Sequence, residues 1–185
     1  MEIPQINQNL KEWIQVLSWF IGAVGVVATA SLGVIAAFRA VRTNKAELRW
    51  KKSNLARQLI AQIESDPKVV AVFHMIDLTA DDVDIGNGHP ETVTAEEIAK
   101  SFAAGDGPFT DKDTPIRKCF DCLFTHLEHL QHAIDREMIE LEDVRYFFPY
   151  HMKNMHKIKG IPPYLVRYKF HLAKTFLDHY SANAR

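Results

Sequence analysis

Residues 115–138 read PIRKCFDCLFTHLEHLQHAIDREM, and this stretch decides the fold. Its large apolar residues recur every three or four positions, which is the period of one face of an α-helix. They are Phe120, Leu123, Leu127, Leu130 and Ile134. Thr114 and Pro115 precede the pattern, as residues at helix starts do. The stretch therefore predicts the central helix of a helical domain.

The segments around this stretch predict further helices and no strand. Asp66 and Pro67 supply an N-cap and a first helical residue, and Thr94 to Glu97 form a capping box. More helices are expected from Leu141 to near Pro149 and from Pro163 to Tyr180. Loops are expected at 79–93, which is acidic and contains glycine, and at 105–113.

A second stretch, WIQVLSWFIGAVGVVATASLGVIAAF at residues 13–38, contains no charged residue. A helix of that length exceeds the roughly 30 Å hydrocarbon core of a bilayer, so the stretch predicts a transmembrane helix. Trp13 and Trp19 lie near one end, where aromatic rings favour the membrane interface. A cleaved signal peptide, cut near Ala28-Thr29-Ala30, is the alternative, but no basic segment precedes the run.

The basic residues predict the orientation of that span. Lys11 is the only one before it, whereas Arg39, Arg42, Lys45 and Arg49 follow it closely. Short flanks rich in Lys and Arg stay in the cytoplasm. We therefore expect a single-pass membrane protein with its N-terminus outside and its C-terminal domain in the cytoplasm.

The expected fold class is all-α, with one N-terminal transmembrane helix followed by an irregular cytoplasmic bundle of about five helices. The expected parts are a short extracytoplasmic N-terminus, the transmembrane helix, a basic juxtamembrane helix and a cytoplasmic helical domain. Their predicted ranges are 1–12, 13–38, 39–64 and 65–185.

Small residues recur at helical spacing along the uncharged run, and we call them the small-residue stripe. They are Ser18, Gly22, Gly25, Thr29, Gly33 and Ala37. Such residues let two helix backbones approach closely. The stripe predicts a homo-oligomer, although glycine and alanine are also common in membrane helices without that role.

Charge is balanced overall but uneven along the chain. The formal net charge is −1, which gives no global field for nucleic acid. Acids dominate residues 77–113 and bases dominate 151–185. This split indicates either internal complementarity or contact with anionic lipid or an anionic ligand. The candidate contact residues are Arg39, Arg42, Lys45, Arg49, Lys153, Lys157 and Lys159.

Cys119, Cys122, His126 and His129 form the candidate metal set on the predicted central helix. Thiolate and imidazole are zinc ligands, and pairs spaced by three or four residues can share one ion. Four ligands on one straight helix cannot surround an ion, so a second element or subunit would be needed. The alternative is that the cysteines are core residues and the histidines border the core. We expect no resident cofactor, with zinc as the candidate to test.

The sequence lacks a phosphate-binding glycine loop, a G-x-S-x-G elbow and an H-E-x-x-H motif. It therefore predicts a non-enzymatic, membrane-anchored interaction or effector module that works as a homo-oligomer. The lipid bilayer, a second copy and a protein partner or ligand of the cytoplasmic domain are the expected partners. One alternative is an accessory subunit of a membrane complex, docking through Tyr146, Phe147, Phe148 and Tyr150, although burial in the domain's own core is expected for most of these rings. The other is a metal-binding protein that uses the Cys/His helix.

The stretch from Cys119 to Met155 carries a resemblance. It reads CFDCLFTHLEHLQHAIDREMIELEDVRYFFPYHMKNM. It resembles a pattern in a loose group of bacterial proteins of uncharacterised function that place one N-terminal anchor before a small helical domain. The resemblance implies that architecture and a bacterial inner membrane, and it implies no chemistry.

Overall fold

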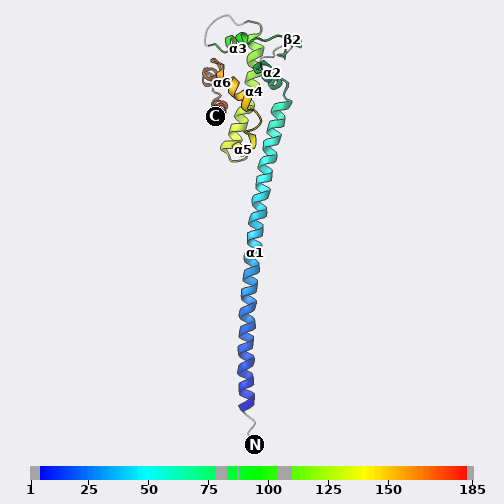
Figure 1. Cartoon of the computed structure of the whole chain (residues 1–185), viewed down its shortest axis with the longest axis vertical. Coiled ribbons are helices and arrows are strands. Elements are labelled where there is room, and N and C mark those ends of the chain that lie inside the picture. Colours follow the sequence, from blue (N-terminus) through cyan, green and yellow to red (C-terminus); the bar gives the residue numbers. More distant parts are fainter. Residues whose placement is uncertain (1–4, 78–82, 87, 104–109, 183–185) are drawn as a thin grey trace. The chain divides into compact units, whose positions relative to one another are not determined.

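The computed structural model of the chain describes residues 5–77, 83–86, 88–103 and 110–182, with side chains except at 5–9, 21–35 and 181–182. It divides into two compact units, Met1–Trp50 (unit 1) and Lys51–Arg185 (unit 2). Helix α1, Gln5–Ser65, begins in unit 1 and ends in unit 2 (Figure 1). It ends one residue beyond the predicted end at residue 64.

The predicted membrane span is not confirmed. Among the residues that the structure describes, none of the helices combines the length and the apolar character that crossing a bilayer requires. A membrane span needs about 20 consecutive, predominantly apolar residues. The prediction of a single-pass inner-membrane protein is therefore wrong.

Two helix starts in unit 2 follow the sequence prediction. Helix α2, Pro67–Ile76, begins after Asp66, whose side chain accepts the Lys68 backbone N–H at 2.9 Å. Helix α3, Ala95–Ser101, begins with the predicted capping box between Thr94 and Glu97. Both caps satisfy backbone N–H groups that the first turn of a helix leaves without partners.

A short antiparallel pair of strands was not predicted. Strand β1, Val83–Asp84, pairs with β2, Pro90–Glu91, so that Val83 lies opposite Glu91. Gly86 and Gly88 between them adopt positive φ angles of 94° and 74°, which glycine tolerates best. The described chain is otherwise mostly helical, as the sequence indicates.

Helix α4, Asp113–Asp135, is the centre of unit 2. It packs against α2, α3 and α8, and Figure 1 shows α2 and α3 near one end of α4. Four residues of the predicted apolar face, Phe120, Leu123, Leu127 and Leu130, are fully buried. Ile134 is only partly buried against the same core. The predicted central helix and its core face are thus confirmed.

The C-terminal part contains more helices than predicted. They are α5 (Leu141–Val144), α6 (Pro149–Lys157), α7 (Ile161–Arg167) and α8 (His171–Ala182). The predicted helix from Pro163 to Tyr180 is interrupted at Lys169, whose φ of 64° lies in the left-handed region. The Phe170 N–H donates to the Leu165 carbonyl oxygen at 2.8 Å, which closes the end of α7.

Candidate functional site

Three side chains of different types meet where α2 begins beside α4. Asp66 is the N-cap of α2, and Cys122 and His126 lie one turn apart on α4. A single carboxylate oxygen, Asp66 Oδ2, lies 3.1 Å from Cys122 Sγ and 3.2 Å from His126 Nε2. One donor atom from each residue lies within 4.8 Å of the other two. We call this group the Asp-Cys-His cluster.

The cluster is half-buried, and its protonation follows from that position. Burial raises the pKa of Cys122, the Asp66 carboxylate raises it further, and the value reaches about 11. The thiol is therefore neutral near pH 7 and donates to Asp66. Burial also acts to raise the pKa of Asp66, but hydrogen bonds from Cys122, His126 and the Lys68 N–H outweigh it and lower the pKa overall. The result is an anionic oxygen that faces two donors.

The structure divides the four predicted metal ligands. Cys122 and His126 belong to the cluster, whereas His129 is exposed elsewhere on α4. Cys119 is buried, its Sγ lies 3.7 Å from the Ile85 carbonyl oxygen, and burial raises its pKa to about 11. The described residues therefore do not bring the predicted set of four together.

Asp66 was predicted as a helix cap but not as a member of a metal site. Its Asp-Pro position is visible in the sequence, but Cys122 and His126 lie 56 and 60 residues further along the chain. Only the packing of α2 against α4 brings the three together. The sequence signal that could have found it is the need for a second element beside Cys122 and His126.

The described parts of unit 1 expose a series of large apolar side chains on α1. They are Leu10, Trp13, Ile14, Val16, Leu17, Trp19, Phe20, Phe38, Val41, Leu48 and Trp50. Trp19 is 76% exposed and Trp13 is 70% exposed. We call these residues the apolar surface of α1.

The small-residue stripe runs along the same helix. Ser18 is exposed and its hydroxyl donates to the Gln15 carbonyl oxygen at 2.8 Å, and Ala37 is exposed. Gly22, Gly25, Thr29 and Gly33 lie in α1, but their surroundings fall outside the side chains that the structure describes.

The predicted anion-contact residues fall in both units. Arg39, Arg42, Lys45 and Arg49 are exposed on the unit 1 part of α1. In unit 2, Lys153, Lys157 and Lys159 are exposed, and the Lys157 ammonium donates to Asn154 Oδ1 at 3.0 Å. Charged and titratable groups of the acidic and basic regions lie close together in unit 2 at His151, whose Nε2 lies 3.3 Å from Asp77 Oδ1. This pair supports the interpretation that the acidic and basic regions complement each other within unit 2.

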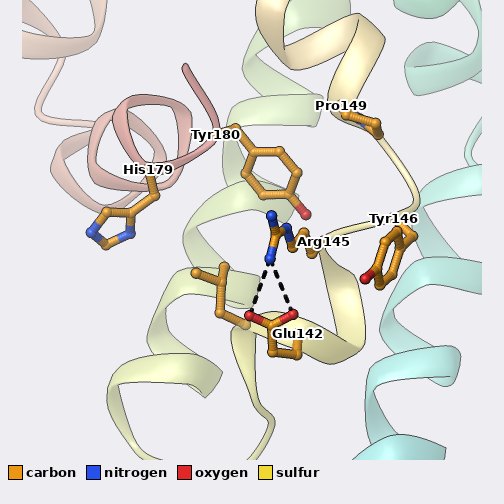
Figure 2. A pocket seen from close by; sticks show the side chains of 7 residues that line it. Glu142, Arg145, Tyr146, Pro149, His179 and Tyr180 are labelled. Carbon is orange, nitrogen blue, oxygen red and sulfur yellow. Dashed lines mark hydrogen bonds and ion pairs between the residues drawn. The ribbon is translucent and has the colours of Figure 1, made fainter. Parts of the chain in front are cut away.

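A cavity of about 300 Å³ lies between α5, the start of α6 and α8. Figure 2 shows its lining, and the residues are Leu141, Glu142, Arg145, Tyr146, Pro149, His179 and Tyr180. Arg145 Nη1 already contacts both Glu142 carboxylate oxygens at 3.4 Å. Tyr180 donates its hydroxyl to the Val144 carbonyl oxygen. Arg145, Glu142 and the Tyr180 hydroxyl thus already have partners within unit 2.

The predicted aromatic docking face is only partly exposed. Phe148 is buried at 2% exposure and packs 5.7 Å from Phe73, measured between ring centroids. Tyr146, Phe147 and Tyr150 are exposed. Three of the four predicted rings are therefore available for contact.

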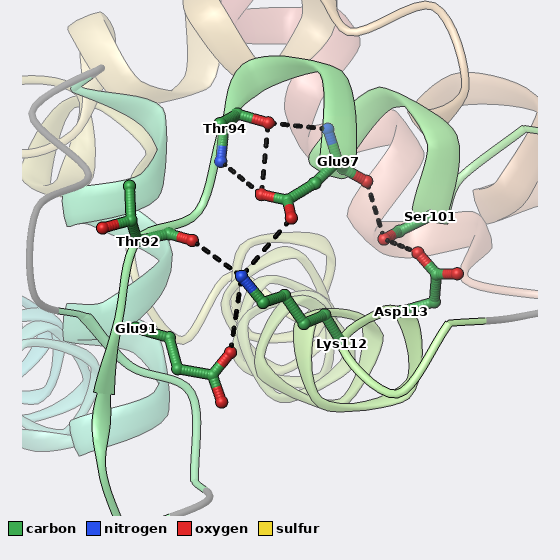
Figure 3. Close-up of polar contacts among 7 residues, drawn as sticks. All are labelled: Glu91, Thr92, Thr94, Glu97, Ser101, Lys112 and Asp113. Carbon is green, nitrogen blue, oxygen red and sulfur yellow. Dashed lines mark hydrogen bonds and ion pairs between the residues drawn. The ribbon is translucent and has the colours of Figure 1, made fainter.

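A polar network around Lys112 joins β2, α3 and α4 (Figure 3). The Lys112 ammonium donates to the Thr92 carbonyl oxygen at 3.1 Å and lies 3.6 Å from Glu91 and 3.4 Å from Glu97. Buried Asp113 accepts the Ser101 hydroxyl at 2.9 Å. Burial acts to raise the pKa of Asp113, but hydrogen bonds from Thr110 and Ser101 lower it overall. The network stabilises helix ends.

Comparison of the sequence with protein-family models, with curated proteins and with solved structures gives no match. Function must therefore be argued from the residues above, and the resemblance carried by Cys119 to Met155 stays a prediction.

Proposed function

We propose that this chain is a non-enzymatic interaction module that works as a homo-oligomer. Unit 1 supplies the association element through α1, and unit 2 supplies the folded surface that receives a partner or ligand. The observation that carries the proposal is the apolar surface of α1, defined by the exposed side chains from Leu10 to Phe20 and from Phe38 to Trp50.

The described part of unit 1 is a single helix, so within that unit its apolar side chains have no second element to pack against. Burying apolar surface is worth about 25 cal/mol per Å², and each large aliphatic or aromatic side chain contributes about 1.5–3 kcal/mol when fully buried. Exposed apolar patches larger than about a few hundred Å² typically mark interaction sites. The described groups from Leu10 to Phe20 and from Phe38 to Trp50 each expose several large apolar side chains.

A second copy of the same helix is the occupant we propose. Identical helices present identical surfaces, so one patch can pair with itself around a two-fold axis. The small-residue stripe supports close approach of the two backbones, because its residues from Ser18 to Ala37 recur at helical spacing. A helix this long also gives many turns over which side chains can interlock.

Unit 2 supports the partner-binding part of the proposal. Tyr146 is 77% exposed and lies beside the cavity of α5, α6 and α8, and Phe147 and Tyr150 are exposed nearby in sequence. Aromatic residues are enriched in protein interfaces because they bury large area at low entropic cost.

The test is the mass of the purified full-length chain by native mass spectrometry, compared between two leucine triples. The variant Gly25→Leu, Thr29→Leu, Gly33→Leu fills the stripe and is expected to shift the chain toward monomers of about 21.1 kDa. The matched control Val24→Leu, Val27→Leu, Ser31→Leu adds leucines at positions about half a helical turn away and is expected to keep the oligomer.

A wild-type chain that stays at one chain mass at micromolar concentration would contradict the proposal. Equal dissociation by both triples would contradict the assignment of the stripe as the contact.

A further inference from the structure

The Asp-Cys-His cluster has the geometry of a metal site. Cys122 and His126 are four residues apart on α4 and so lie on one face of the helix, which lets both reach one point. Asp66 comes from the start of α2, so the third donor approaches from another direction. Ligands on one straight helix cannot surround an ion, and α2 supplies the second element that such a site needs.

The two distances from Asp66 Oδ2 are close to those around a bound ion, and Cys122 Sγ and His126 Nε2 lie within 4.8 Å of each other. Tetrahedral zinc, with ligand bonds of about 2.0–2.3 Å, holds its ligand atoms roughly 3.3–3.6 Å apart. Asp66 Oδ2 lies 3.2 Å from His126 Nε2 and 3.1 Å from Cys122 Sγ. Small rotations of the half-buried side chains, which move the donor atoms apart by a few tenths of an ångström, make room for the ion.

The fold holds the donors in place. Helices α2 and α4 pack directly against each other, and Asp66 is fixed by its second oxygen, Oδ1, on the Lys68 backbone N–H. The side chains of His126 and Asp66 are 23% and 25% exposed, so an ion and a water molecule can reach the cluster from solvent.

We propose that Asp66, Cys122 and His126 bind one zinc ion through Oδ2, Sγ and Nε2, with a fourth position left for water or another exchangeable ligand. Oxygen, sulfur and nitrogen donors in one set suit zinc, whereas calcium and magnesium take oxygen donors only.

The proton balance of binding is simple. The Cys122 thiol, which donates to Asp66 in the metal-free protein, loses its proton to solvent and its sulfur bonds zinc as the thiolate. The ion takes the place of the thiol hydrogen beside Asp66 Oδ2, and His126 binds through the Nε2 lone pair of its neutral imidazole, whose single N–H hydrogen then lies on Nδ1, so this change of tautomer adds no net proton release. One thiol proton is released for each ion bound, and no electron is transferred.

The test uses Co²⁺ as a spectroscopic probe and Zn²⁺ as its competitor, on the full-length chain after removal of bound metal. Thiolate bound to Co²⁺ gives a charge-transfer absorption band, so the band reports a sulfur ligand directly. We expect one equivalent of Co²⁺ to produce the band and one equivalent of Zn²⁺ to abolish it.

Two control variants on α4 separate the cluster from its neighbours. Cys122→Ala should remove the band, whereas Cys119→Ala should keep it, because Cys119 lies buried against Ile85. His126→Ala should weaken Co²⁺ binding at least tenfold, whereas His129→Ala should leave it unchanged, because His129 lies outside the cluster. Losing a direct ligand costs no less than losing a supporting hydrogen bond, which costs roughly 10–100-fold.

Asp66→Asn tests the carboxylate without removing the helix cap, because asparagine caps helices as well as aspartate does. It should weaken Co²⁺ binding at least tenfold, by the same reasoning. The Co²⁺ affinity is read together with the melting temperature, so that unfolding cannot be mistaken for ligand loss.

Three results would overturn the proposal. The first is the absence of a thiolate band together with Zn²⁺ binding far below one ion per chain. The second is a band that disappears in Cys119→Ala and persists in Cys122→Ala. The third is unchanged affinity in both Asp66→Asn and His126→Ala, which would leave the cluster with hydrogen bonding alone.

Discussion

The two units of this chain differ in how far their large apolar side chains are buried. In unit 2, Phe120, Phe124 and Leu127 on α4 are fully buried, and α4 packs against α2, α3 and α8. In unit 1, Trp13 and Trp19 are 70% and 76% exposed on a single helix. Burial of apolar surface is the main driving force of folding. Unit 2 therefore contains a buried core of its own, whereas the described apolar side chains of unit 1 are not buried within that unit.

The largest expected effect is the loss of a core aromatic in unit 2. Phe124→Ala removes a fully buried ring that contacts Phe102, Tyr164 and Phe170. We expect a loss of about 3–5 kcal/mol in the free energy of unfolding, measured by denaturant titration with circular dichroism. Tyr146→Ala is the matched control on an exposed ring, expected to change stability by less than about 0.5 kcal/mol. Equal losses in both would contradict the division into core and contact rings.

The next largest effect concerns the close approach of Gly160 to α3. A methyl group added at Gly160 would lie 2.5 Å from Phe102 Cβ and 2.7 Å from the Phe102 carbonyl oxygen, so backbone has to move. Gly160→Ala is expected to destabilise unit 2 by about 1–3 kcal/mol. Its exposed neighbour provides the control, since Lys159→Ala should fall within about 0.5 kcal/mol of wild type. Similar unfolding curves for both variants would show that this approach is not tight.

Acid sensitivity is a smaller effect and should belong to unit 2. The pKa of Asp113 is lowered, because hydrogen bonds from Thr110 and Ser101 outweigh burial. The ionised form therefore stabilises the folded state above the usual aspartate pKa of about 3.9, and this contribution is lost as pH falls through the lower folded value. Melting temperatures from pH 5 to 2 should fall less steeply for Asp113→Asn than for wild type. Parallel curves would exclude Asp113 as a source of the acid sensitivity.

The smallest expected effect is the change in the stability of unit 2 caused by substitutions in unit 1. The leucine triple at Gly25, Thr29 and Gly33 should leave the denaturant unfolding of unit 2 within about 0.5 kcal/mol of wild type, although it changes the association state. Additivity of distant sites is the physical reason. A loss of several kcal/mol in unit 2 would mean that the two units do not fold independently.

Local signals in the sequence predicted much of unit 2. The cap at Asp66 and the capping box at Thr94 are confirmed, because both depend on residues within three positions of the helix start. The buried face of α4 is confirmed because its apolar spacing is regular.

The missed features depend on contacts between distant residues. The left-handed Lys169 that separates α7 from α8 has no glycine to indicate it, so the break could not be placed from local sequence. The β1–β2 pair is two residues long on each side, too short for a strand pattern. The role of Asp66 beside Cys122 required a packing arrangement across 56 residues.

The most direct test of the division into two units is sedimentation equilibrium of the full-length chain beside a fragment of residues 51–185, over a micromolar concentration range. The account predicts a multiple of 21.1 kDa for the full-length chain and a folded monomer for the fragment. A monomeric full-length chain, or a fragment that associates as strongly as the full chain, would contradict it.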